Sequence, residues 1–105
     1  MTGDLYVLDD NHNPVSVDPL TWSEFLMRPG SRRVGWSELA DGVIVSTVFL
    51  GLDHRMLGYG PPILFETMVL SDYGWDDQVR YCTWDEAVAG HRAMIDAVRQ
   101  RIMEL

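Results

Sequence analysis

Two apolar runs near the middle of the chain dominate its hydrophobic pattern. VIVSTVFLGL covers residues 43–52 and ILFETMVL covers residues 63–70. Both runs are rich in β-branched and aromatic residues, as strands are. In the first run, odd-numbered and even-numbered positions are both largely apolar, which predicts a central strand covered on both faces. We therefore expect two long strands at the centre of the core.

Shorter segments complete a predicted antiparallel sheet. The turn formers DDNHNP separate the first two of these segments, and Asp41-Gly42 is the strongest hairpin signal in the chain. A polar turn is expected over residues 72–77. The shorter strands are predicted at residues 5–8, 15–17, 33–39 and 78–82.

Capping residues predict two helices. Asp18 is a suitable N-cap before Pro19, and this helix is expected to end near residue 28, before Pro29-Gly30. Thr83 and Glu86 have the spacing of a capping box at the start of a C-terminal helix. The predicted apolar stripe of that helix comprises Val88, Ile95, Val98, Ile102 and Leu105, with His91 on the same face.

These elements predict one α+β domain over residues 1–105. We expect an antiparallel sheet of four to six strands packed by the C-terminal helix, with a short helix near the N-terminus.

The composition limits which cellular compartment and which classes of partner we expect for this chain. All eight basic residues are Arg, as in proteins from GC-rich genomes, and the net charge is −8. This charge disfavours nucleic acids and anionic membranes as partners. The start MTGDLYVLDDN lacks the order of a signal peptide, and the apolar runs are shorter than the roughly 20 residues of a membrane span. With its single cysteine, the chain is expected to be soluble and cytoplasmic.

The loop between the long strands, DHRMLGYGPP, contains the first group of candidate site residues. Asp53 beside His54 suggests a general base with an orienting carboxylate. Neighbouring residues of a strand point to opposite faces, so a hydrogen-bonding role at a strand end is the alternative. Arg55 and Tyr59 of this loop, with Arg80 further along, are candidate ligand-binding residues.

Glu66 is the second candidate, because it interrupts an apolar strand. A buried carboxylate costs several kcal/mol unless it is paired or protonated. Glu66 is therefore interpreted either as an acid, base or ligand clamp, or as the partner of Arg80. If the long strands pair, it lies level with Thr47 or Val48. A polar spot is then expected from Glu66, Ser46, Thr47 and Thr67.

Metal and nucleophile chemistry receive little support from the sequence. His91 is expected to be a core histidine that donates to a backbone carbonyl. His54, His91 and Glu66 would bind a metal only if the fold brought them together, and HxxH, HExxH and CxxC spacings are absent. Cys82 precedes a helix start, where a thiolate is favoured, but a buried structural cysteine is the alternative. We expect no metal and no cofactor.

Three segments resemble a family of small proteins of tailed phages, common in phages of actinobacteria and other high-GC hosts. They are VSTVFLGLDH, GPPILFETMV and RYCTWDEAVAGH, which are similar to the family patterns VSTVxLGLDH, GPPxLFETMV and RYxTxxEAxxGH. The resemblance covers most of the chain and implies a phage origin. It implies no activity and assigns no catalytic role to any residue.

Three functions remain open from the sequence. The first is a non-enzymatic phage accessory protein that binds a host protein or a small ligand in the host cytoplasm, with a role against host defence as one use. The second is a small hydrolase or lyase that uses His54 and Glu66, with Asp53 as orienter. The third is a virion structural or assembly protein, for which a homodimer is expected.

Overall fold

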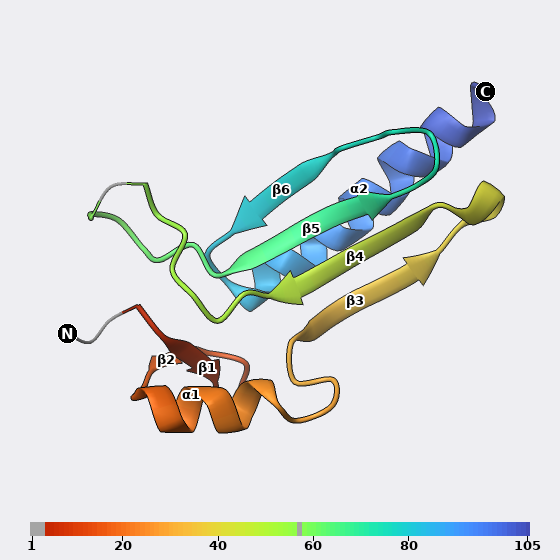
Figure 1. Ribbon diagram of the computed structural model, residues 1–105. Helices are drawn as coiled ribbons and strands as arrows, with labels where there is room; N and C mark the ends of the chain where they lie inside the picture. Colours follow the sequence, from red (N-terminus) through yellow and green to blue (C-terminus); the bar gives the residue numbers. More distant parts are fainter. Residues whose placement is uncertain (1–3, 57) are drawn as a thin grey trace.

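The two long apolar runs form the middle strands of a four-stranded antiparallel sheet. The computed structural model describes residues 4–56 and 58–105; Leu57, in the predicted loop, lies outside this part of the chain. The sheet order is β3-β4-β5-β6 (Figure 1). Its strands are β3 (Arg33–Glu38), β4 (Ile44–Phe49), β5 (Phe65–Leu70) and β6 (Gln78–Tyr81). The α+β class and the antiparallel sheet are therefore confirmed.

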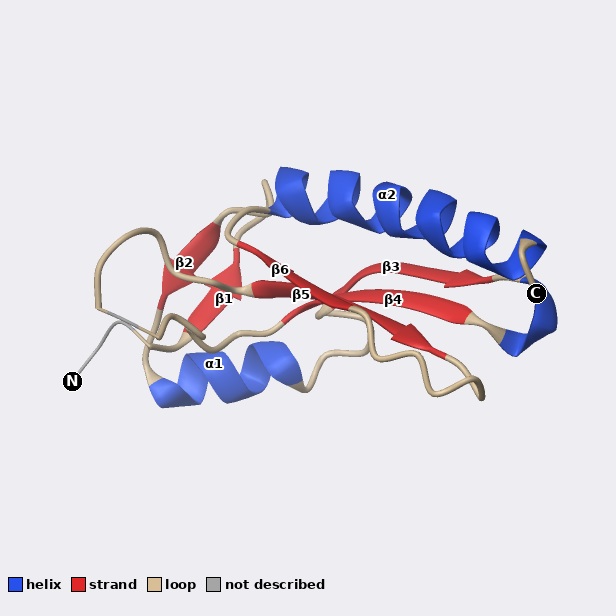
Figure 2. Cartoon of the chain, turned by 90° about the horizontal axis from the view of Figure 1, so that it is seen from above, coloured by secondary structure: helices blue, strands red, loops and turns tan. Residues whose placement is uncertain are grey.

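A small N-terminal unit lies at one end of this sheet. It consists of the hairpin β1 (Tyr6–Leu8) and β2 (Pro14–Ser16), followed by α1 (Pro19–Leu26). Asp18 caps α1 as predicted, since its Oδ1 accepts from the Thr21 amide at 3.0 Å. The helix ends at Leu26, two residues earlier than predicted. Figure 2 shows α1 and the C-terminal helix on opposite sides of the sheet, with α1 displaced toward one end.

The long helix α2 (Trp84–Met103) covers one face of the four-stranded sheet (Figure 2). The predicted capping box is present: the Glu86 amide donates to Thr83 Oγ1, and the Thr83 amide donates to Glu86 Oε1, both at 3.1 Å. Leu105 does not belong to the packed stripe, because it follows the helix and is 65% exposed. The residues that α2 buries are Ala87, His91 and Val98.

The prediction that the first long strand is covered on both faces is wrong. Along β4, Val45, Thr47 and Phe49 are buried, whereas the alternate side chains are partly exposed. The reason is that α2 packs on one face only, while α1 lies at the end of the other. The four-stranded sheet thus keeps an open face. Within residues 4–56 and 58–105, no helix combines the length and hydrophobicity needed to cross a membrane.

The core consists of two separate apolar clusters. Phe25, Phe49, Leu64, Phe65 and Ala87 form one cluster, at the α1 end of the molecule. The other lies between the far part of the sheet and the second half of α2, and its buried members are Val43, Val45, Val69 and Val98. Along the buried faces of β4, β5 and α2, the buried polar residues Thr47, Thr67 and His91 lie between the two clusters.

Candidate functional site

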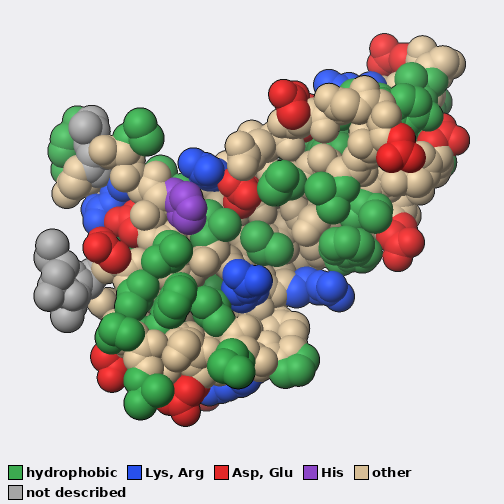
Figure 3. All heavy atoms as spheres, in the orientation of Figure 1, with side chains coloured by type: hydrophobic (Ala, Val, Ile, Leu, Met, Phe, Trp, Pro, Cys, Tyr) green, Lys and Arg blue, Asp and Glu red, His purple; other side chains and the backbone are tan. Residues whose placement is uncertain are grey.

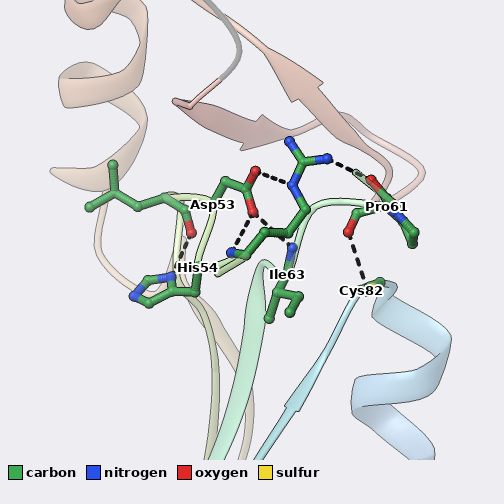
Figure 4. A network of polar contacts seen from close by, with 8 residues as sticks. Asp53, His54, Pro61, Ile63 and Cys82 are labelled. Atoms are coloured by element: carbon green, nitrogen blue, oxygen red, sulfur yellow. Dashed lines mark hydrogen bonds and ion pairs between the residues drawn. The ribbon is translucent and has the colours of Figure 1, made fainter. Parts of the chain in front are cut away.

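Asp53 fixes the shape of the loop between β4 and β5 (Figure 4). Its Oδ1 accepts from the amides of Arg55 and Ile63 at 2.9 and 3.1 Å, and its Oδ2 accepts from Arg55 Nε at 2.6 Å. Arg55 also donates through Nη1 to the Gly60 carbonyl at 2.5 Å. Both side chains are therefore engaged in closing the loop on itself.

The electrostatics of Asp53 agree with this structural role. Burial on its own would raise the pKa of the carboxyl group. The two backbone amides and the Arg55 guanidinium outweigh burial and hold the pKa of Asp53 below its usual value. Asp53 is thus a permanently charged acceptor at neutral pH, not a proton donor.

His54 points away from the carboxylate beside it in sequence (Figure 4). Its Nδ1 bonds the Leu52 carbonyl at 2.8 Å. A carbonyl only accepts, so Nδ1 carries the proton and the neutral ring has its lone pair on Nε2. In the described part of the chain, no hydrogen bond joins His54 to Asp53. The structure therefore does not supply the orienting carboxylate that a base at His54 was expected to have.

Glu66 lies on β5 opposite Val48, in the predicted register. Its Oε2 accepts from Arg80 Nε at 2.9 Å and from Gln78 Nε2 at 2.5 Å. The residue is 7% exposed, whereas the Arg80 side chain is 42% exposed. The pairing of Glu66 with Arg80 is confirmed: the pair joins β5 to β6, with a buried carboxylate and a partly exposed guanidinium.

The predicted polar spot does not form as one cluster. Thr47 pairs with Thr67 across the strands, and both lie on the face covered by α2. Glu66 follows Phe65 and precedes Thr67, so the alternation of strand side chains places it on the open face. The carboxylate and the two threonines are therefore on opposite faces of the sheet.

A buried chain of polar side chains crosses the interface between the sheet and α2. His91 Nδ1 bonds Thr47 Oγ1 at 2.6 Å, and Thr47 Oγ1 bonds Thr67 Oγ1 at the same distance. Tyr81 donates to Thr67 Oγ1 at 3.1 Å, and His91 Nε2 bonds Ser37 Oγ at 2.9 Å. The expectation that His91 would donate to a backbone carbonyl is wrong, because hydroxyl groups from β3 and β4 occupy both ring nitrogens.

When His91 is neutral, one direction of the hydrogens in this chain gives an acceptor to each hydroxyl hydrogen of the fully buried Thr47 and Thr67. Tyr81 donates to Thr67, Thr67 donates to Thr47, and Thr47 donates to Nδ1 of His91. Nε2 then carries the ring proton and donates it to Ser37. Every hydroxyl in the layer is used, which is the condition for burying polar groups without a large cost. We call these five residues the polar layer: Ser37, Thr47, Thr67, Tyr81 and His91.

Two glycines make room for the polar layer, and sequence reasoning missed both roles. A Cβ at Gly35 would lie 2.9 Å from the His91 ring. A Cβ at Gly90 would overlap the phenol ring of Tyr81. The available signal was a glycine inside a predicted strand and another inside a predicted helix, which indicates a close approach of neighbouring groups.

Stability should decline below about pH 6.5 because of His91. Burial lowers the pKa of His91 from its usual 6.5, since the imidazolium would lose its hydration. The fold thus prefers the neutral ring, and this contribution to stability is complete above pH 6.5 and is lost as the pH falls toward the lower pKa of the folded state. Urea unfolding followed from about pH 8 to about pH 5 measures the decline.

The matched variants for this measurement are His91→Gln and His54→Gln. The first should flatten the decline; the second is the control, because it removes a histidine outside the polar layer. Asp53 does not interfere, because its pKa lies below 3.8 and its stabilisation is lost only in a more acidic range. An unaltered decline in His91→Gln would contradict the assignment.

Cys82 and Tyr59 border a shallow hollow of about 380 Å³ at the loop. Burial raises the pKa of the Cys82 thiol, with Glu86 and Asp53 adding to the effect. This is opposite to the thiolate that a helix start was expected to favour. Tyr59 is 75% exposed. The site therefore offers an aromatic surface and a neutral thiol, not an activated nucleophile.

No group of three metal-ligating side chains gathers anywhere in residues 4–56 and 58–105. The His91 side chain lies between α2 and the sheet, whereas Glu66 lies on the open face, so the set of His54, His91 and Glu66 is not brought together.

The open face of the sheet exposes large apolar side chains. Trp36 of β3 is 43% exposed there, and Met68 and Leu70 of β5 are 41% and 40% exposed, with β4 between the two strands. In the view of Figure 3, hydrophobic side chains gather over the sheet, and blue arginine side chains gather between α1 and the sheet. A hollow of about 700 Å³ adjoins the apolar part. Its lining includes Ile44, Met68, Leu70, Asp72, Trp75 and Asp76.

In comparisons with family models, curated proteins and solved structures, no match to this chain was found.

Proposed function

We propose that this protein is a non-catalytic accessory protein of a tailed phage, which acts in the host cytoplasm by docking a host protein. The observation that carries the proposal is the open sheet face with its large exposed side chains Trp36, Met68 and Leu70. The resemblance to small phage proteins and the small, acidic chain support the phage part of the proposal. Interference with a host defence system is a role that fits such binding.

The composition of the open face is typical of protein interfaces. Tryptophan and methionine are enriched at such surfaces, whereas monomers rarely leave a large contiguous apolar patch uncovered. The hollow of about 700 Å³ beside Met68 and Leu70 would accept an anchoring side chain of the partner. A face with exposed aromatic and thioether groups beside a hollow supports recognition better than chemistry.

The negative charge beside the hollow indicates which kind of partner surface would fit. Asp72 and Asp76 line the same hollow as the apolar residues, and the net charge of the chain is −8. A partner surface with an apolar anchor flanked by basic groups would complement both. The overall negative charge would also accelerate the encounter with such a partner.

The enzymatic alternative, a hydrolase or lyase using His54 and Glu66, receives less support. Glu66 is held by Arg80 and Gln78, and Asp53 is held by Arg55 and the loop backbone. A free general acid or base would need these contacts to be released. The virion alternative depends on self-association, which the experiment below detects.

We expect a substitution on the open face to weaken partner binding. A photo-crosslinking amino acid in place of Trp36, expressed in the host during infection, should crosslink one host protein. The purified partner should then bind the wild-type protein, and Met68→Glu should weaken this binding at least about tenfold, because a charge enters the apolar contact. Isothermal titration calorimetry measures the change.

The matched control is Val79→Glu. Val79 is 42% exposed, close to the 41% of Met68, but it pairs with Thr67 and therefore belongs to the other face of the sheet. Equal loss of binding in both variants would show a general effect of charge. A crosslink to a second copy of the chain would favour the virion reading, and either result would overturn the proposal.

A further inference from the structure

A second hollow lies where the loop after α1 reaches the sheet. Its volume is about 330 Å³, and its lining consists of residues 26–33 and Val48. We call it the arginine hollow, because Arg28, Arg32 and Arg33 line it. The surrounding stretch, residues 25–37, contains these three arginines and no acidic residue, although the whole chain has a net charge of −8. A local positive site is thus built into an acidic protein.

The three arginines differ from those that serve the fold. Arg55, Arg80 and Arg101 each pair with a carboxylate. Within the described ranges, no carboxylate pairs with Arg28, Arg32 or Arg33.

Aromatic rings support two of the three cations. The Arg28 guanidinium carbon lies 5.8 Å from the centre of the Phe25 ring, and that of Arg33 lies 5.3 Å from the centre of the Trp36 ring. Such contacts orient a guanidinium through its face and leave its N–H groups at the edge. The donors of Arg28 and Arg33 therefore remain available for an anion.

The loop that presents these arginines is fixed by backbone hydrogen bonds. The backbone amide of Ser31 donates to the Arg28 carbonyl at 3.1 Å, and the amide of Arg33 donates to the Gly30 carbonyl at 3.2 Å. The amide of Phe49 donates to the Arg32 carbonyl at 2.7 Å. The last bond ties the loop to β4. A site held in this way loses little conformational entropy when a ligand binds.

Ser31 provides an independent sign of a missing acceptor. Its hydroxyl is shielded from solvent and has no hydrogen-bond partner among residues 4–56 and 58–105. A buried hydroxyl without a partner costs about 1–3 kcal/mol. Ser31 belongs to the lining of the hollow, so an oxyanion bound there would accept its hydrogen after a rotation of the side chain.

We propose that the arginine hollow binds a small phosphate-bearing molecule. Guanidinium groups pair with phosphate oxygens through two parallel hydrogen bonds, and three positive charges favour a ligand with at least two negative ones. The volume lies at the lower end of that of small-molecule sites. Leu26, Pro29 and Val48 add an apolar wall for an organic part of the ligand. A nucleic acid strand would extend beyond the hollow onto the acidic surface, which repels it.

The test is a titration of the purified full chain with inorganic pyrophosphate, followed by amide NMR. We expect saturable shifts confined to residues 26–33, with a Kd below about 1 mM that increases with salt. The double variant Arg28→Ala/Arg32→Ala should weaken binding at least about tenfold. The control Arg92→Ala/Arg99→Ala should bind as the wild type does, since it removes two α2 arginines outside the hollow.

Several outcomes would overturn this inference. They are shifts spread over the molecule, no saturation at millimolar pyrophosphate, and equal weakening in the α2 control. Citrate binding as tightly as pyrophosphate would reject the phosphate assignment, and tighter binding of a single-stranded oligonucleotide would reject a small ligand. Titrations of the wild-type protein alone can give four of these five results, so the inference stays testable if the variants unfold. It is independent of partner docking, which Met68→Glu tests.

Discussion

Thr47→Val is expected to lower the free energy of unfolding by about 3 kcal/mol, although it preserves the size of the side chain. The exchange removes the acceptor of the Thr67 hydrogen and the donor to His91 Nδ1, both at 2.6 Å. Each buried polar group left without a partner costs about 1–3 kcal/mol. Water cannot replace the lost partner, because Thr47 and Thr67 are fully buried. Chemical denaturation at neutral pH measures the loss.

Thr47→Ser is the control, because it keeps the hydroxyl and removes only a methyl group, at a cost of about 1 kcal/mol. A second test uses His91→Phe alone and combined with Thr47→Val. Since the two residues share one hydrogen bond, their effects should not add, with a coupling energy of at least about 1 kcal/mol. A stability of Thr47→Val within about 0.5 kcal/mol of the wild type would mean that the buried chain contributes little.

Gly90→Ala is expected to destabilise the protein by about 2 kcal/mol, because the new methyl group overfills a packed site. In an exposed helix the same exchange stabilises by about 1 kcal/mol, so the sign should be reversed. The added Cβ would overlap the Tyr81 ring, whose hydroxyl bonds Thr67. Tyr81 is held between α2 and the first apolar cluster. Moving the ring aside would therefore break the hydrogen bond and expose apolar surface.

Ala97→Gly tests the ordinary helix preference, since Ala97 is exposed on the same helix. It should cost about 1 kcal/mol. Combining Gly90→Ala with Tyr81→Ala should cost less than the sum of the two changes, because the overlap is then gone. Thermal unfolding of the wild type, the three single variants and the double variant gives all the values. A stabilised Gly90→Ala would show that the Tyr81 ring moves at little cost.

Features set by local sequence were predictable. The caps at Asp18 and Thr83 depend on residues within one turn, and both are present. The register that places Glu66 opposite Val48 could be predicted from the pairing of the two long strands alone. Its pairing with Arg80 was one of two stated alternatives, because a buried carboxylate next to a strand with one arginine has few other partners.

Features set by distant packing were not predictable in the same way. The pattern of β4 is apolar on both faces, and only the position of α1 decides that one face stays open. His91 meets hydroxyls that lie 44 and 54 residues away in sequence, so no local pattern connects them. The arginine hollow was missed, although the acid-free stretch around Arg28, Arg32 and Arg33 was visible in the sequence.

The polar layer between the two apolar clusters has a consequence for how uniquely the chain folds. On the buried face, Thr47 lies between Val45 and Phe49, and Thr67 lies between Phe65 and Val69. If the interior were apolar throughout, a shifted alignment of these strands would leave no buried polar group without a partner. A shift of β5 along β4 would instead separate the two hydroxyls, and a shift of α2 by one turn would set His91 against valine. Each misalignment would leave buried hydrogen-bonding groups without partners. The polar layer therefore destabilises every alignment of the strands and the helix except the native one.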